Sequence, residues 1–133
     1  MKVKGLNGRE YIWDLGKQIY LDDRRKRSKL HLRCRAILNT IFPLLQIYEE
    51  VSMPGSNHLT LDFYIPNKYL AIECQGEQHY KFIPHFHKHI EGFMNSKKRD
   101  QRKHEWCQLN DILLVTLPYN EDDNEWRNRI ENN

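Results

Sequence analysis

The chain has 133 residues, of which 39% are hydrophobic and 29% are charged, and its formal net charge is +3. This length suits one domain with its own core, and the composition is that of a globular protein with a well-solvated surface. The charged N-terminus lacks a secretory apolar stretch, and no run approaches the roughly 20 apolar residues that span a bilayer. We therefore expect a cytoplasmic protein. The weak positive charge favours nucleic acid as a partner without establishing it.

Three cysteines, Cys34, Cys74 and Cys107, stand at wide spacings along the chain. An odd number without a Cys-x-x-Cys pair argues against a disulfide framework and against a zinc ribbon. We expect reduced thiols that pack in the core.

Residues 1–27 are predicted to be a polar, basic N-terminal arm, and residues 28–133 are predicted to be the folded domain. The arm has few apolar residues, and those expected to reach the core are Tyr11, Ile12, Trp13, Ile19 and Tyr20. A helix is predicted from Ser28, which can cap its start, to residue 42, because apolar side chains recur there at helical spacing and Pro43 ends the pattern.

Three β-like runs follow, separated by turn-forming residues, at 45–51, 59–65 and 69–75. Residues 76–94 show no clean period and are expected to be a long loop of the kind that carries function. A second helix is predicted over 96–110, a central strand covered on both faces over 112–117, and a terminal helix over 121–131. This order predicts an α/β fold with a mixed sheet of about four strands flanked by helices.

Two carboxylates are predicted to meet on one face of this sheet. The odd-numbered residues of the second β-like run are all apolar: Leu59, Leu61, Phe63 and Ile65. Because side chains alternate between the two faces of a strand, Asp62 is predicted to point to the face opposite these four. If residues 67–68 form a two-residue turn, Asp62 lies opposite Glu73. Like charges about 5 Å apart at Cβ are destabilising unless a cation neutralises them. Hard oxygen ligands favour Mg²⁺ or Mn²⁺, and Gln75 on the same face could orient a metal-bound water.

Asp62, ten intervening residues and Glu73-Cys74-Gln75 resemble the D…(D/E)-x-K signature of PD-(D/E)XK nucleases. With residues 72–80, 99–103 and 112–115, the chain is similar to small phage-type nucleases of this superfamily, which are related to very-short-patch repair and homing endonucleases. The resemblance implies a restriction-endonuclease-like αβββαβ core. It also implies a metal-dependent endonuclease that hydrolyses phosphodiester bonds of DNA.

The resemblance also implies a mechanism and roles for particular residues. The metal would be held by Asp62, Glu73 and the main-chain carbonyl of Cys74, where it polarises the scissile phosphate and activates a water. Lys103 or Gln75 would stabilise charge in the transition state. His79 would act as an acid or as a phosphate contact, because histidine titrates near neutrality.

The sequence departs from the signature at two positions. Gln75 stands in place of the lysine, and His31 stands where many relatives carry a glutamate on the first helix. On the second helix four residues form one stripe, which would let Lys103 supply the missing positive charge: Ser96, Asp100, Lys103 and Cys107. The competing interpretation is an ordinary ion pair between Asp100 and Lys103 on a solvated helix face.

Basic residues gather in two runs that flank the predicted site. Charge runs are usually solvated surface, but beside a nuclease site they favour contacts with backbone phosphates. The residues predicted to contact nucleic acid are Arg24, Arg25, Lys26, Arg27, Lys97, Lys98, Arg99 and Arg102. The expected partner is DNA, with a homodimer as the alternative to a monomer, and the expected place is the host-cell cytoplasm if the chain is phage-encoded.

Two other interpretations stay open. Gln75 and His31 allow a catalytically inactive, nuclease-derived DNA-binding protein. The alternation of His85, His87 and His89 allows a structural module built on zinc. Within the nuclease class, the sequence does not choose between nicking, repair, homing and junction resolution.

Overall fold

A computed structural model describes residues 1–15, 27–87 and 89–132, and residue 86 without its side chain. The chain is a mixed α/β protein. Its elements, in chain order, are β1 (Lys2–Lys4), β2 (Glu10–Ile12), α1 (Lys29–Ile41), β3 (Tyr48–Ser52), β4 (Thr60–Ile65), the 3₁₀ turn η2 (Pro66–Lys68), β5 (Leu70–Gln75), the 3₁₀ turn η3 (Glu77–His79), α2 (Pro84–His87), α3 (Ile90–Leu109), β6 (Leu113–Pro118) and α4 (Asp123–Glu131).

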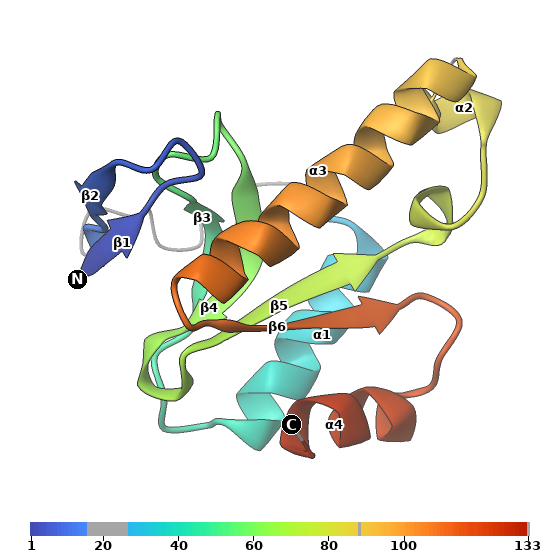
Figure 1. The fold of residues 1–133 in the computed structure, drawn as a ribbon. Helices are drawn as coiled ribbons and strands as arrows, with labels where there is room; N and C mark the ends of the chain where they lie inside the picture. The colour runs from blue at the N-terminus through green and yellow to red at the C-terminus, as the bar shows by residue number, and fades with distance from the viewer. Residues whose placement is uncertain (16–26, 88, 133) are drawn as a thin grey trace.

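The main sheet has four strands in the order β3-β4-β5-β6, and only the β5–β6 pairing is parallel. Helix α3 lies over one face, and α1 and α4 lie on the other (Figure 1). Trp106 of α3 belongs to one hydrophobic cluster, while Leu38 of α1 and Trp126 of α4 belong to the second. The predicted four-stranded mixed sheet with flanking helices is therefore confirmed.

The register of the β4–β5 hairpin agrees with the prediction. Ile65 pairs with Leu70, and Phe63 pairs with Ile72. The turn itself differs, because a 3₁₀ turn and Tyr69 at a φ of 48° occupy the connection instead of a two-residue loop. The connection is one residue longer at each end than predicted, 66–69 instead of 67–68. Because the two additions are symmetric, the same residues stay opposite each other and the predicted register is correct although the predicted turn is not.

The apolar residues of β4 do not share one face along its whole length, which corrects the sequence prediction. Leu59 and Leu61 pack in the cluster with Trp106, whereas Phe63 and Ile65 pack in the cluster with Trp126. The change falls at Asp62, where pairing with β5 stops and where the facing β3 residue, Glu50, has a φ of 51°. A local turn of the backbone at this point breaks the simple alternation.

Strand β6 lies at an edge of the sheet, so its prediction as a central strand is wrong. Val115 and Leu117 are buried against the helices, but Leu113 keeps 45% of its surface exposed. An apolar run alone does not distinguish a central strand from an edge strand that is covered by helices.

Helix α1 is confirmed with its cap, since the Ser28 hydroxyl accepts the His31 N–H at 3.0 Å. Helix α3 starts at Ile90, earlier than predicted, and together with η3 and α2 its first residues replace most of the expected loop over 76–94. The early half of α3 extends beyond the sheet (Figure 1). It therefore has no continuous buried stripe, and its periodicity is not visible in the sequence.

Residues 1–15 contribute more to the core than predicted, because β1 and β2 form an antiparallel hairpin. Val3 and Trp13 are each only 2% exposed, and the Trp13 indole donates to the Ser52 carbonyl at 2.8 Å. Ile12 is 74% exposed, so its predicted place in the core is wrong. The predictions for Ile19 and Tyr20 lie outside the described residues. Among the described residues, none of the helices combines the length and the hydropathy that a membrane span requires.

Candidate functional site

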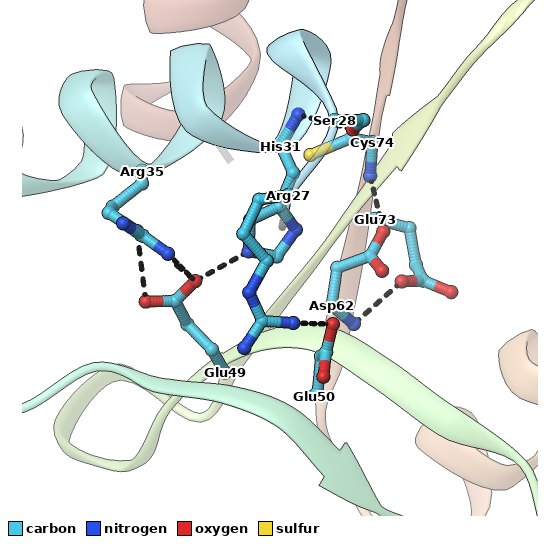
Figure 2. Close-up of polar contacts among 9 residues, drawn as sticks. All are labelled: Arg27, Ser28, His31, Arg35, Glu49, Glu50, Asp62, Glu73 and Cys74. Atoms are coloured by element: carbon cyan, nitrogen blue, oxygen red, sulfur yellow. Dashed lines mark hydrogen bonds and ion pairs between the residues drawn. The ribbon is translucent and has the colours of Figure 1, made fainter. Parts of the chain in front are cut away.

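Asp62 and Glu73, called here the acid pair, lie at the point where β4 and β5 stop pairing. The Asp62 N–H donates to Glu73 Oε2 at 2.8 Å, and the Cys74 N–H donates to Asp62 Oδ2 at 2.9 Å (Figure 2). Each carboxylate thus accepts an amide from the opposite strand. The structure brings the predicted pair together. At this point the two strands are joined by hydrogen bonds from backbone N–H groups to side-chain carboxylates, and not by hydrogen bonds between backbone groups.

Lys103 reaches the acid pair from α3. Its Nζ lies 2.5 Å from Glu73 Oε1, and the two side chains are only 18% and 8% exposed. The predicted stripe of α3 faces the sheet, with Ser96 and Asp100 beside Lys103 along one pocket and Cys107 buried beyond it. An ammonium therefore stands beside the acid pair even though residue 75 is a glutamine.

Burial raises the pKa of Glu73 to about 8, and the nearby Asp62 carboxylate adds to the rise, while Lys103 acts in the opposite direction. Desolvation and a like charge both disfavour the ionised form of a carboxyl group. One lysine does not compensate for two carboxylates in this environment. The acid pair is therefore a place where additional positive charge is stabilising.

His79 and Asp100 form a second polar contact on the same side of the sheet. The His79 ring nitrogen Nδ1 lies 2.9 Å from Asp100 Oδ2. Asp100 thus pairs with η3 and not with Lys103, which corrects the simple ion-pair interpretation of α3. Both residues, together with Lys103, line a pocket of about 350 Å³.

Gln75 follows Glu73 on β5 and is half-buried. Its Oε1 accepts the Tyr80 hydroxyl at 2.7 Å, so the amide is oriented by the residue that follows η3. The described contacts of Gln75 lead toward Tyr80 and not to the acid pair.

A polar cluster between α1 and β3 surrounds His31, the residue that stands where many relatives carry a glutamate. His31 Nε2 lies 2.5 Å from Glu49 Oε1, and Arg35 donates to the same oxygen at 3.2 Å (Figure 2). Burial alone would raise the pKa of Glu49, but the hydrogen bonds from His31 and Arg35 outweigh it and hold the pKa below its ordinary value. Sequence reasoning missed Glu49, because its partners lie on a different element and no motif marks it.

Cys74 contributes its backbone to the acid pair, and its side chain packs on the second core cluster next to Cys34. The contact with Cys34 raises the pKa of the Cys74 thiol, and burial raises it further. All three cysteines are free thiols, as predicted, and Cys34 and Cys107 are buried. The Cys74 thiol is therefore not suited to act as a nucleophile.

The residues predicted to contact nucleic acid lie in different settings. Arg24, Arg25 and Lys26 lie outside the described residues. Arg27 forms an ion pair with Glu50 and is 10% exposed in its side chain. On α3 the predicted cations are Lys97, Lys98 and Arg99, which are exposed, and Arg102, which is half-buried.

The histidine-rich segment forms helix α2 and the start of α3. His87 is 9% exposed, packs against Phe82 and Phe93, and accepts the Ile83 N–H at 3.0 Å on Nδ1. Within the described ranges, no group of three or more His, Cys, Asp or Glu side chains is arranged to hold a metal ion. The zinc interpretation of His85, His87 and His89 therefore gains no support.

The acid pair offers two carboxylates to a divalent ion, which is the number that Mg²⁺ typically takes from a protein, with waters and phosphates completing its shell. The N–H donors of Asp62, Cys74 and Lys103 already engage Asp62 Oδ2 and both Glu73 carboxylate oxygens. Two carboxylates, with most of their oxygens already hydrogen-bonded, fit a magnesium ion that keeps most of its water ligands. Lys103 is the cation with which such an ion competes.

No protein-family model matches the chain, and no solved structure matches it. The chain is similar to three viral proteins whose names state no activity. It is 46% identical over 65 residues to Uncharacterized protein 307L of Invertebrate iridescent virus 6, which is 49% of this chain and 33% of that protein. It is 38% identical over 99 residues to Uncharacterized protein 033L of Invertebrate iridescent virus 3, which is 69% of this chain and 50% of that protein.

The third relative is Uncharacterized protein 094L of Frog virus 3 (isolate Goorha), which is 39% identical over 62 residues, or 46% of this chain and 40% of that protein. The chain thus spans half or less of the length of each of these relatives. The similarity relates the chain to proteins of viruses. Its activity has to be argued from the site.

Proposed function

We propose that the chain is a Mg²⁺-dependent DNA endonuclease of the PD-(D/E)XK superfamily. The observation that carries the proposal is the acid pair, with the Lys103 ammonium 2.5 Å from Glu73 Oε1. The order α1, β3, β4, β5, α3, β6 agrees with a restriction-endonuclease-like αβββαβ core. Because the similar proteins come from viruses, the proposed setting is an infected host cell, with DNA in its cytoplasm as the substrate.

In this proposal Asp62, Glu73 and the Cys74 carbonyl hold the magnesium ion, which supplies Lewis acidity to the scissile phosphate and to a bound water. Lys103 places a preorganised positive charge where the phosphoryl oxygens gain charge in the transition state. Asp100 orients His79, which can hold or deliver a proton at the leaving oxygen. Gln75, two residues after Glu73 on β5, is held in place by the Tyr80 hydroxyl.

A second candidate is a DNA-binding protein of nuclease origin that does not cleave. Its support is that Asp62 Oδ2 and both Glu73 carboxylate oxygens already accept protein N–H groups. With these hydrogen bonds the acid pair and Lys103 would join β4, β5 and α3 without a metal ion.

A cleavage assay separates the two candidates. The wild-type protein and the Asp62→Asn variant are incubated with supercoiled plasmid, single strands and branched junctions, with Mg²⁺, with Mn²⁺ or with EDTA. The nuclease proposal expects nicking or cutting by the wild type only when a divalent metal is present, and none by the variant. Binding of DNA without any cleavage under all these conditions would overturn it in favour of the second candidate.

A further inference from the structure

Three hollows lie along α3, and the loop that joins β3 to β4 lines two of them. The hairpin hollow, of about 490 Å³, is lined by the N-terminal hairpin, by residues 55–57 of the loop and by Arg102. The helix hollow, of about 300 Å³, is lined by Asn95, Lys98, Arg99 and Arg102. The lysine hollow, of about 350 Å³, is lined by Lys103 and by residues 58–60, at the end of this loop and the start of β4.

Shared residues make these hollows one groove. Arg102 lines both the hairpin hollow and the helix hollow, and Arg99 lines both the helix hollow and the lysine hollow. Consecutive segments of the β3–β4 loop form the opposite wall of the two outer hollows. The groove therefore runs from the N-terminal hairpin along α3 to Lys103.

The charge along the α3 wall is positive. Lys98, Arg99, Arg102 and Lys103 lie along it, and the one acidic residue among those that line the three hollows, Asp100, is bound to His79. The Arg102 Nε is buried and has no hydrogen-bond partner in the structure. A buried donor without an acceptor is unfavourable, so this arginine gains a hydrogen bond if its side chain turns toward a phosphate in the groove.

The hairpin hollow owes its shape to a close approach of two backbones. The Leu6 N–H donates to the Gly55 carbonyl at 2.9 Å, and a Cβ on Gly55 would lie 2.5 Å from the Gly5 Cα. Tyr11 and Asn7 line this hollow, and the Asn7 amide donates to the Tyr11 hydroxyl at 2.7 Å. An aromatic ring beside an amide, in a hollow that has room for one nucleoside, suits a single unpaired base.

We infer that this groove binds a single strand of nucleic acid, with one base in the hairpin hollow and its neighbouring phosphates on Arg102, Lys98 and Arg99. A positive groove with an aromatic side chain is the usual way in which proteins hold single strands. That the strand continues to the acid pair rests on the proposed nuclease function. The binding itself does not.

The test measures binding in a Glu73→Gln background, in which the proposed cleavage is blocked. The affinity for a short fluorescent oligodeoxythymidine strand is measured by anisotropy over a salt series. Lys98→Ala and Arg102→Ala are each expected to weaken binding about tenfold at low salt and to lower the salt slope by about 0.7. Asn7→Ala is expected to weaken binding while leaving the slope unchanged, since it removes no charge.

The matched control is Lys68→Ala, because Lys68 is an exposed lysine on the β4–β5 turn and lines none of the three hollows. Thermal unfolding checks that each variant folds. If Arg102→Ala does not fold, Lys98→Ala still tests the groove, because Lys98 is exposed. The inference is overturned if Lys98→Ala and the control bind equally, or if a duplex of the same sequence binds as tightly as the single strand. Groove-dependent binding without cleavage by the wild type would overturn only the nuclease proposal.

Discussion

Two glutamates of the sheet, the half-buried Glu49 on β3 and the buried Glu73 on β5, experience opposite electrostatic environments. Glu49 contacts His31 and Arg35, and its pKa is held below the ordinary value. Glu73 has Asp62 as well as Lys103 beside it, and its pKa is raised to about 8. Burial penalises both carboxylates, so the difference comes from the balance of neighbouring charges. Glu49 has the charge partners of a structural residue, whereas Glu73 lacks the positive charge that a bound cation would bring.

The largest expected effect is on cleavage. Glu73→Gln should lower the initial rate of plasmid nicking by about a thousandfold, because one of two metal-binding carboxylates is lost. Glu49→Gln should leave that rate within about threefold of wild type, and should lower the free energy of unfolding by about 1–3 kcal/mol because His31 and Arg35 lose the negative charge and one acceptor oxygen of their partner. Equal cleavage by wild type and Glu73→Gln would remove the acid pair from the mechanism.

Removal of the lysine should have the next largest effect. Lys103→Met should lower kcat by about a hundredfold, the typical loss when one charge-stabilising group is removed from a transition state. Because Lys103 lowers the pKa of Glu73, its loss should also move the acid limb of the pH–rate profile to higher pH. Lys103→Arg serves as the charge-conserving control, and an unshifted acid limb in Lys103→Met would contradict the assigned contact.

The two glutamates should also give opposite pH dependences of stability in the absence of metal. The folded-state pKa of Glu73 is raised from 4.5 to about 8, so folding favours its protonated form and its contribution to stability falls as pH rises between those values. The pKa of Glu49 lies below 4.5, so its contribution is present above that pH and falls as pH drops further.

Chemical denaturation across this pH range measures both effects. Subtracting the curve of Glu73→Gln from that of wild type should isolate the first slope, and the same subtraction with Glu49→Gln should isolate the second. Two slopes of the same sign would contradict the contrast between the two sites.

The smallest expected effect concerns the helix that carries His31 to Glu49. Ser28→Ala removes the acceptor of the His31 N–H and should lower the free energy of unfolding by about 1 kcal/mol. Ser28→Asp should retain the cap, since aspartate is an equally good N-cap residue. Urea denaturation measures the difference, and equal midpoints for Ser28→Ala and wild type would show that this cap contributes nothing.

Local chemistry made part of this fold predictable. The cap at Ser28 and the alternation of β5 and of the last three residues of β4 each depend on neighbouring residues, so the start of α1 and the pairing of Phe63 with Ile72 followed from the sequence. The closeness of Asp62 and Glu73 then followed from the register.

Features that depend on distant contacts were missed. The β1–β2 hairpin consists of strands of three residues each, too short for a visible alternation, and Val3 is buried by elements remote in sequence. The pairing of Asp100 with His79 in place of Lys103 depends on where η3 lies against α3. Periodicity carries no information about such contacts.

The exchange of amides and carboxylates between β4 and β5 makes two backbone protons into reporters of the site. The N–H groups of Asp62 and Cys74 each point at a carboxylate of the acid pair and not at a carbonyl of the neighbouring strand. Their NMR chemical shifts should therefore respond to protonation of the pair and to added Mg²⁺, while the amide of Ile72, within the regular ladder, stays nearly constant. Ion binding can thus be followed residue by residue without a substrate and without turnover.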